Sequence, residues 1–286
     1  IKTVGLYMIL RGWAMTVSAE SPKLSILHVL TLNGRNGEYG GPVRVARELC
    51  TELNSRGHTT HIFSGARTGS EPVPNPGLAE SYVLVKPISR RLAVSSLWSW
   101  KLIKPLSKLI KSSDVIHIHF ARDLIPFLAG ILSILNKKPF IAQTHGMIVQ
   151  DGRMSTKVID LLFTTPLLKM SKKTLVLTEN EKSDVNNLRV KAELEILPNG
   201  INVELNADKS NAQEKNIVFC SRLEKRKGID KFIQLASKFH ANGLMFDIYG
   251  PDGGELEFVL NEIKSGNFHG SLNYRGSLES AEVQEV

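Results

Sequence analysis

The sequence is poor in cysteine, with only Cys50 and Cys220 among 286 residues. Neither has a cysteine or histidine nearby at metal-ligand spacing, which argues against a disulfide framework and against a structural zinc site. Two isolated thiols favour a reducing compartment, so we expect a cytoplasmic protein. We also expect Cys220, at the end of the apolar run Ile217–Cys220, to be a small buried core residue.

Long apolar runs are also absent, and none approaches the ~20 residues needed to cross a bilayer. Hydrophobic residues make up 42% and charged residues 22% of the chain, a balance typical of globular proteins. The net charge of +8 favours an anionic partner without naming one. The basic residues of the chain are spread out and no nucleic-acid motif is visible, so nucleic acid is a poor candidate for this anionic partner.

The first 23 residues have neither a strand pattern nor turn signals, and the chain begins with Ile1 rather than Met. We expect residues 1–23 to be a leader or upstream extension outside the domains, with Met15 a better candidate start. A signal peptide is the alternative, although no convincing cleavage site follows the apolar stretch Val4–Leu10.

From Leu24 onwards, short apolar runs alternate with longer amphipathic ones. This rhythm predicts parallel sheets covered by helices on both faces. A polar stretch after Pro198-Asn199-Gly200 indicates a linker, and we expect two Rossmann-like domains, 24–205 and 206–286, the second incomplete. The predicted strands are Ser25–Leu32, Thr59–Ser64, Tyr82–Val85, Val115–Phe120, Phe140–Thr144, Thr174–Thr178, Leu194–Leu197, Ile217–Cys220, Met245–Tyr249 and Leu272–Tyr274. The predicted helices are Pro42–Arg56, Ser95–Lys111, Leu124–Leu135, Thr156–Met170, Glu181–Leu188, Gly228–Ala241 and Glu255–Ser265, with another beginning at Ser280.

Two motifs of the first domain follow predicted strands. In Tyr39-Gly40-Gly41-Pro42-Val43-Arg44 the paired glycines let backbone N–H groups approach a ligand at a helix N-terminus, although a plain tight turn explains them equally well. In Thr144-His145-Gly146 the histidine lies at the carboxyl end of a strand, where open parallel sheets bind ligands. A lone histidine can equally be structural, and His117 and His119 read as ordinary packed or edge residues.

Two further motifs lie in the second domain. In the run Ser221–Gly228, Arg222 ends a strand and Lys227 begins a helix, so together they can bind a diphosphate; the alternative is a solvated basic loop. Tyr249–Gly254, with the sequence YGPDGG, is a glycine-rich loop after the next strand. Such a loop is suited to close contact between backbone and ligand.

The segment Leu97–Ser112 is strongly amphipathic, with its lysines on one face and its leucines and isoleucines on the other. Such a helix can lie on an anionic membrane or pack on the sheet with a solvated basic face. Pro105 threatens the helix near its middle.

Taken together, these residues resemble the retaining glycosyltransferases of family 4, which have the GT-B fold of two Rossmann-like domains. The resemblance runs from Leu24 to Val286 and rests on six motifs in order: YGGPVRVA, THG, LTENE, PNGI, SRLEKRKG and YGPDGG. Ser221 departs from the pattern, since family members often have glycine there.

The resemblance implies that a sugar passes from a nucleotide-diphosphate sugar to a glycan or lipid-linked glycan with retention. No metal and no cofactor besides the sugar donor are implied. Arg222 and Lys227 match the pair that neutralises the leaving diphosphate, and His145 matches a residue that contacts the donor sugar. The glycines of the donor or phosphate loops correspond to Gly40, Gly41, Gly250 and Gly253, and the acceptor side includes Tyr39 and Arg44.

One family element is absent, because no two glutamates in the chain lie eight positions apart as in the family's donor-binding signature. We therefore expect a C-terminally truncated chain that is inactive by itself. The alternatives are a nucleotide-sugar epimerase of the same fold and a non-catalytic fragment or binding module. The sequence names neither the sugar, the base nor the acceptor, although the family suggests polysaccharide or glycolipid assembly.

Overall fold

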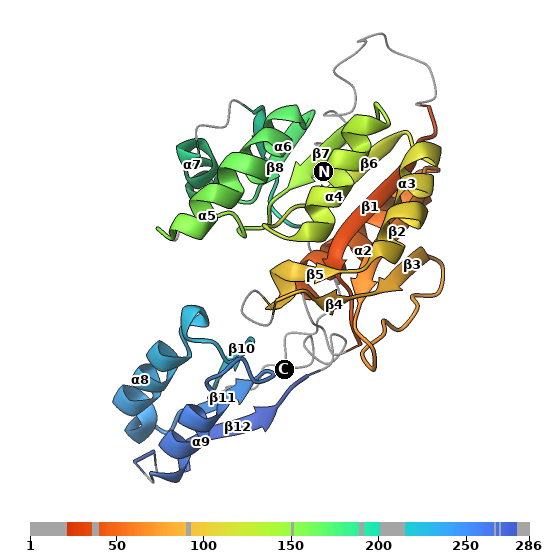
Figure 1. The fold of residues 1–286 in the computed structure, drawn as a ribbon. Coiled ribbons are helices and arrows are strands. Elements are labelled where there is room, and N and C mark those ends of the chain that lie inside the picture. The colour runs from red at the N-terminus through yellow and green to blue at the C-terminus, as the bar shows by residue number, and fades with distance from the viewer. Residues whose placement is uncertain are drawn as a thin grey trace, which may run out of the picture. The chain divides into compact units, whose positions relative to one another are not determined.

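The computed structural model describes residues 22–35, 40–89, 93–149, 152–188, 192–200, 215–265, 267–268 and 270–278. The chain divides into two compact units, Ile1–Val203 and Glu204–Val286, called here the first and the second unit. Each has its own parallel sheet and its own hydrophobic core (Figure 1). Tyr39, almost all of the expected leader, most of the linker and the helix expected from Ser280 lie outside the described residues.

The first unit contains a sheet of seven parallel strands in the order β3-β2-β1-β6-β7-β8-β9. Each of these strands overlaps one predicted from the sequence. Their bounds are β1 Ser25–Leu32, β2 Thr59–Ala66, β3 Ala79–Leu84, β6 Val115–His119, β7 Phe140–Gln143, β8 Lys173–Val176 and β9 Leu194–Ile196. A short antiparallel pair, β4 Lys86–Pro87 and β5 Leu97–Trp98, was not predicted.

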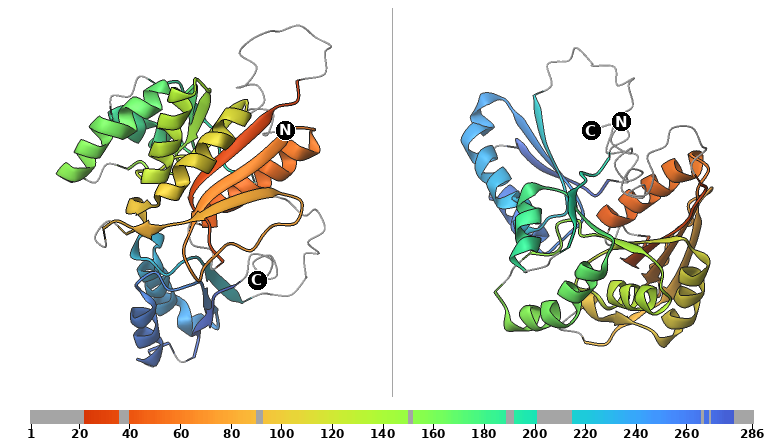
Figure 2. Two further views of the ribbon diagram at one scale, coloured as in Figure 1. Left: turned by 45° about the vertical axis from the view of Figure 1, so that its right-hand side comes forward. Right: turned by 90° about the horizontal axis from the view of Figure 1, so that it is seen from above.

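Helices cover both faces of this sheet. On one face, α2 buries Val43, Ala46 and Cys50 against Leu30 and Ile62. The main core fills the other face, between the sheet and α3 and α4 (Figure 2). The helices are α2 Gly40–Ser55, α3 Ile103–Ser112, α4 Leu124–Leu135, α5 Met154–Ile159, α6 Thr165–Met170 and α7 Glu179–Asn187.

Helix α3 corrects the prediction of one helix over Ser95–Lys111. The chain instead makes a 3₁₀ turn at Ala93–Ser96, the strand β5 and a second turn at Trp100–Leu102 before α3 begins at Ile103. Pro105 explains this start, because in the first turn its missing N–H removes no helical hydrogen bond. Leu102, Leu106 and Ile110 are fully buried in the core, so this apolar face covers the sheet and is not available to a membrane.

The predicted helix Thr156–Met170 is present but contains a turn of π-helix, Asp160–Thr164, between α5 and α6. The backbone N–H of Thr165 donates to the carbonyl of Asp160, five residues back. Pro166 follows directly and has no N–H for the usual bond four residues back, which accounts for the local change of pitch.

The second unit has three parallel strands in sequence order, β10 Asn216–Cys220, β11 Met245–Tyr249 and β12 Leu272–Gly276. Its core joins Ile229 and Ile233 of α8 (Ile229–Phe239) to Phe246, Ile248 and, from α9 (Leu256–Lys264), Val259. Shorter 3₁₀ turns lie at Lys225–Lys227 and His240–Asn242. None of the described helices of the chain is long and apolar enough to cross a bilayer.

The prediction that Cys220 is a buried core residue is wrong, because the structure leaves it exposed. Within the described residues β10 pairs only with β11 and is an edge strand, and its residues alternate between exposed and half-buried. An apolar run therefore does not guarantee burial at the edge of a sheet.

Replacing Leu106 by alanine should lower the free energy of unfolding by about 2–5 kcal/mol, because this side chain is fully buried between α3 and the sheet. Urea unfolding followed by circular dichroism measures the change. Trp100, which is 77% exposed on the preceding turn, is the matched control, and its alanine variant should change stability by less than about 0.5 kcal/mol. Equal losses in both variants would contradict this assignment of α3 to the core.

Candidate functional site

The candidate residues of the first unit lie at the carboxyl edge of its sheet. Strand β1 pairs with β2 on one side and with β6 on the other, so the strand order reverses there. In open parallel sheets ligands bind at such a switch point, outside the carboxyl ends of the strands. Gly40 follows β1 and His145 follows β7, so both predicted motifs of the first unit belong to this edge.

The loop after β7 is held by one buried carboxylate. Glu181 accepts hydrogen bonds from the Thr144 hydroxyl and from two backbone N–H groups, those of Gly146 at 2.5 Å and Leu177 at 2.6 Å. At its own helix terminus, the side chain of Thr178 caps α7 by accepting from the Glu181 N–H at 3.2 Å. The THG and LTENE motifs are thus two halves of one hydrogen-bonded structure.

Within this loop His145 has a left-handed backbone with φ 50°. This conformation is unfavourable for a residue with a Cβ, and such strain is concentrated at functional sites. The next residue, Gly146, has φ 72°, where glycine carries no such penalty. The sharp turn directs the His145 ring back towards β6, where its Nε2 lies 2.8 Å from Nδ1 of His119.

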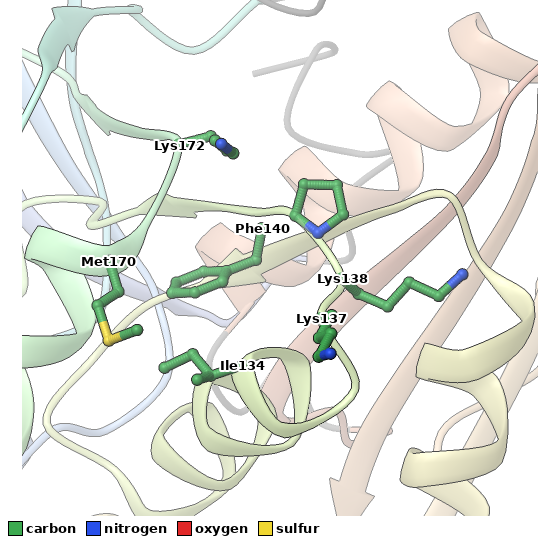
Figure 3. Close-up of a pocket in the computed structure, with 7 residues that line it drawn as sticks. Ile134, Lys137, Lys138, Phe140, Met170 and Lys172 are labelled. Atoms are coloured by element: carbon green, nitrogen blue, oxygen red, sulfur yellow. The ribbon is translucent and has the colours of Figure 1, made fainter.

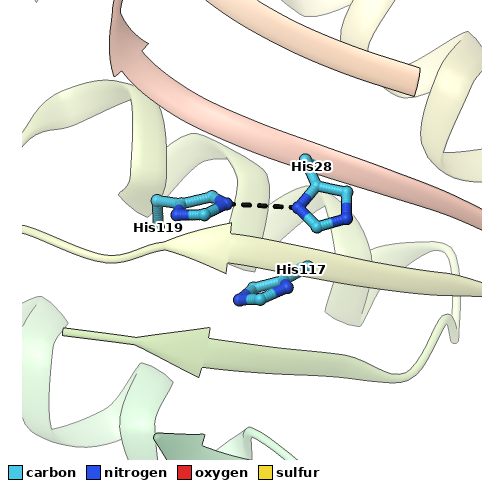
Figure 4. Close-up of side chains that lie close together, drawn as sticks. All are labelled: His28, His117 and His119. Carbon is cyan, nitrogen blue, oxygen red and sulfur yellow. Dashed lines mark hydrogen bonds between the residues drawn. The ribbon is translucent and has the colours of Figure 1, made fainter. Parts of the chain in front are cut away.

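Sequence reasoning missed that His145 is the end of a histidine cluster. His28 on β1 and His117 on β6 are register partners, and His119 lies two residues further along β6 on the same face. All three are fully buried. His28 Nδ1 and His119 Nε2 are hydrogen-bonded at 3.2 Å, and Figure 4 marks this bond by a dashed line. His117 instead contacts Gln143 through its Nε2 at 3.1 Å.

Burial keeps these rings neutral at physiological pH. Desolvation is the largest cause that lowers the pKa of His117 to about 4 and that of His145 to about 3. The pKa values of His28 and His119 are also well below their usual range, first because of burial and then because of the neighbouring histidines. A neutral imidazole has one N–H donor and one bare nitrogen, so the tautomers decide which hydrogen bonds form.

The same cluster is the one set of described residues in which three potential metal ligands converge, with ring nitrogens of His28, His117 and His119 within 4.8 Å of one another. Two features fit a metal poorly. The rings of His117 and His119 are stacked, 8° from parallel with centroids 4.6 Å apart. A histidine nitrogen that binds a metal directs its lone pair in the plane of its ring, so two stacked rings do not point at one shared ion. Both nitrogens of His119 are also already hydrogen-bonded.

The glycine motif after β1 has a different conformation from the predicted loop, because α2 begins at Gly40 rather than at Pro42. Gly40 and Gly41 form its first turn, where backbone N–H groups have no helical partner. A Cβ on either glycine would meet nothing within 4 Å, so packing inside the described structure does not require glycine there. Arg44, one turn later, has a side chain 54% exposed and pairs with Glu48 at 2.7 Å.

In the second unit, Arg222 and Lys227 are both exposed at the carboxyl edge of the sheet, between β10 and α8. The guanidinium of Arg222 lies 3.5 Å from a carboxylate oxygen of Glu224. Lys227 belongs to the 3₁₀ turn that ends at Gly228, directly before the N-terminus of α8. Two cations beside a helix N-terminus form a site suited to an anion.

Two of the three glycines of the YGPDGG loop, Gly250 and Gly253, are required by this neighbouring loop. A Cβ on Gly250, which has φ 149°, would overlap the carbonyl of Ser221, and one on Gly253 would contact the side chains of Arg222 and Glu224. Backbone hydrogen bonds at 3.0 Å join Ser221 to Tyr249 and Leu223 to Pro251. The predicted phosphate glycines therefore also bring the loops after β10 and β11 into direct contact.

A shallow cavity of about 430 Å³ lies elsewhere, at the amino edge of the first sheet where β7 begins. Its lining includes Phe140, Met170 and three lysines, Lys137, Lys138 and Lys172 (Figure 3). The predicted site residues of the first unit belong to the opposite edge of the sheet, so the cavity contributes nothing to the candidate site.

A family model described as Glycosyltransferase Family 4 matches residues 39–205, more than half of the chain. Among curated proteins, none matches this sequence.

Several solved structures have the same fold at low sequence identity. A glycosyltransferase from Rickettsia africae ESF-5 superimposes with a TM-score of 0.62 and 16% identity, covering 93% of this chain and 71% of its own. The pneumococcal O-GlcNAc transferase GtfA, in complex with UDP and GlcNAc, superimposes with a TM-score of 0.67 and 9% identity, covering 91% of this chain and 77% of its own. WaaG, a glycosyltransferase involved in lipopolysaccharide biosynthesis, superimposes with a TM-score of 0.58 and 15% identity, covering 90% of this chain and 71% of its own. The fold is therefore GT-B, as predicted.

Acid should destabilise the first unit because four of its histidines, His28, His117, His119 and His145, are neutral when folded and bind protons when unfolded. Each such histidine contributes fully to the free energy of unfolding above pH ~6.5, its pKa in the unfolded chain. This contribution is lost as the pH decreases towards the pKa of the folded state. For His117, whose folded pKa is about 4, the loss at pH 5 should be about 2 kcal/mol. Urea unfolding at pH 7.5, 6 and 5 measures this slope, and His117→Gln should flatten it. A stability independent of pH over this range would rule out neutral buried rings.

Replacing Gly250 by alanine should destabilise the second unit by at least about 2 kcal/mol more than the same change at Gly243. Both glycines have positive φ, 149° at Gly250 and 70° at Gly243, but a Cβ at Gly243 meets nothing within 4 Å, so the difference reports the overlap with Ser221 together with the less favourable backbone of Gly250. Hydrogen exchange of the second unit measures both variants. Equal effects would show that the loops do not need this close approach.

Proposed function

Because this chain belongs to glycosyltransferase family 4, we propose that it carries donor-site residues of an enzyme that transfers a sugar from a nucleotide-diphosphate sugar to a glycan or lipid-linked glycan, with retention and without a metal. The GT-B fold supports a nucleotide sugar as donor, and one fold neighbour, GtfA, is in complex with UDP and GlcNAc. We place this activity in the cytoplasm, since the two thiols are free.

The observation that carries the proposal is the basic site of the second unit. A departing nucleoside diphosphate gains negative charge in the transition state, and fixed cations and N–H dipoles that face this charge lower the barrier. Arg222 offers a planar fork for two phosphate oxygens and Lys227 a compact charge beside the start of α8. The helix N-terminus adds its own partial positive charge. In this proposal these groups replace the metal cation.

Gly250 and Gly253 support the donor site by letting backbone approach closely around Arg222. In the first unit, His145 contacts the donor sugar, and its strained backbone is the local sign of a functional position. In this proposal Gly40 and Gly41, in the first turn of α2, serve as phosphate-binding glycines through their backbone N–H groups. Tyr39, outside the described residues, and Arg44 belong to the acceptor side.

Calorimetric titration of the chain with UDP, GDP, ADP and CMP tests this donor site. One diphosphate should bind best, and the double variant Arg222→Ala, Lys227→Ala should weaken its binding by at least about 100-fold, because charge-assisted hydrogen bonds contribute about 1.5–3 kcal/mol each and two are lost.

A matched control removes two charges elsewhere in the same unit. Lys238 and Lys264 lie in the last turns of α8 and α9, at the other end of the helices, and their double alanine variant should bind normally. Equal weakening by both double variants would show only a general charge effect. Absence of binding to all four nucleotides would refute a donor site in this part of the chain.

A further inference from the structure

Two strands and a loop bring together three imidazole rings, which are joined by hydrogen bonds in a series that ends at His145. His28 comes from β1, His119 from β6 and His145 from the loop after β7. The hydrogen bonds are His28 Nδ1 to His119 Nε2 at 3.2 Å and His119 Nδ1 to His145 Nε2 at 2.8 Å. The middle ring thus uses both nitrogens, and these three residues are called here the histidine chain.

Each ring of the histidine chain is neutral because desolvation lowers its pKa: His28 and His119 are fully buried and His145 is half-buried. A neutral imidazole donates through one nitrogen and accepts through the other, so His119 must donate to one neighbour and accept from the other. The direction of one hydrogen bond therefore fixes the direction of the other. The tautomer of His145 is coupled in this way to that of His28, two strands away.

His28, the fully buried end of the histidine chain, determines in which direction the two hydrogen bonds between the rings run. His28 Nε2 is buried without a hydrogen-bond partner. If it carried the proton, an N–H donor would be orphaned in the interior, and buried orphaned N–H groups are rarer than unsatisfied acceptors. With a bare Nε2, the proton of His28 lies on Nδ1 and points towards His119. His119 then donates from Nδ1 to His145, whose own proton lies on Nδ1.

We propose that His28 and His119 are positioning residues that fix His145 as the Nδ1–H tautomer, so that it presents a hydrogen-bond donor to the sugar nucleotide. This inference rests on the proposed function for its substrate, but the tautomer itself does not depend on sugar transfer. The left-handed backbone of His145, held through Gly146 by Glu181, aims the ring, and the histidine chain sets which nitrogen carries the proton. A fixed donor can bind a sugar or phosphate oxygen without reorganising.

His117 does not belong to this chain, although it lies beside it. Its Nε2 contacts Gln143 Oε1, and the Gln143 amide nitrogen in turn lies 3.5 Å from the Asn199 side chain. An N–H of His117 therefore points to Gln143, which leaves its buried Nδ1 bare and without a partner. His117 is thus as buried as His28 and His119, and its ring stacks on His119 with centroids 4.6 Å apart, but it carries no hydrogen bond towards His145, so it provides a control.

Long-range ¹⁵N–¹H spectra of the chain labelled in its histidine rings test the assignment directly, since they separate protonated from bare ring nitrogens. We expect His28, His119 and His145 to be protonated at Nδ1 and bare at Nε2, and His117 to be the reverse. Protonated Nε2 in the three residues would overturn the proposed direction. Joint shifts of His28, His117 and His119 on adding one equivalent of Zn²⁺ would overturn the histidine chain in favour of a metal site.

Two substitutions of His119 separate positioning from packing. In His119→Asn the amide lies near the former Nδ1 and still reaches His145, whereas in His119→Gln it lies near the former Nε2 and reaches only His28. His145 should keep a single Nδ1–H tautomer in His119→Asn and in the control His117→Gln, and become a mixture in His119→Gln. An unchanged His145 in His119→Gln would overturn the positioning role.

Kinetics with the sugar donor and acceptor give a second readout. His119→Gln should lower kcat at least about tenfold with little change in KM for the donor, and His119→Asn should restore most of it. Equal kcat in both variants would overturn the role in catalysis. These kinetic measurements use the intact enzyme, and failure of sugar transfer in its wild-type form would instead refute the proposed function, while the spectra of this chain would still decide the tautomer.

Discussion

The carboxylate of Glu181 is the constraint on which the first site depends. It is buried, and a buried ionised group is costly unless donors surround it. Here the donors are the Thr144 hydroxyl and the N–H groups of Gly146 and Leu177, which come from the ends of two neighbouring strands. The glutamate and the loop after β7 therefore stabilise each other. Its two hydrogen bonds to Thr144 and Gly146, on either side of His145, help to hold the strained backbone of that residue.

The strands of both sheets could be predicted because each is a short apolar run bounded by turn residues. β1 and α4 have the predicted bounds, and the carboxyl-edge positions of His145 and Arg222 followed from the order of strand and helix. The histidine cluster could not be predicted in this way. His28 and His117 are 89 positions apart, and only the pairing of β1 with β6 makes them neighbours. The alternation of His117 and His119 on one face of a strand was a signal, but it did not name the partner strand.

The corrected predictions share a cause, since each depended on tertiary context that local pattern does not contain. The amphipathic segment Leu97–Ser112 suited a membrane and a sheet equally, and the burial of Leu106 decides for the sheet. Cys220 lies in an apolar run, but the place of β10 at the edge of its sheet leaves it exposed. The family resemblance supplied the roles of the residues, whereas the structure supplied their contacts.

The close approach of Gly250 to Ser221 has a consequence for how tightly a ligand is held. Because the loops after β10 and β11 are joined by backbone hydrogen bonds and by this contact, they behave as one rigid body. If an anion binds beside Arg222 as proposed, little backbone entropy is lost there, so more of its interaction energy contributes to affinity. In that proposal Gly250 strengthens binding by limiting the motion of its neighbours.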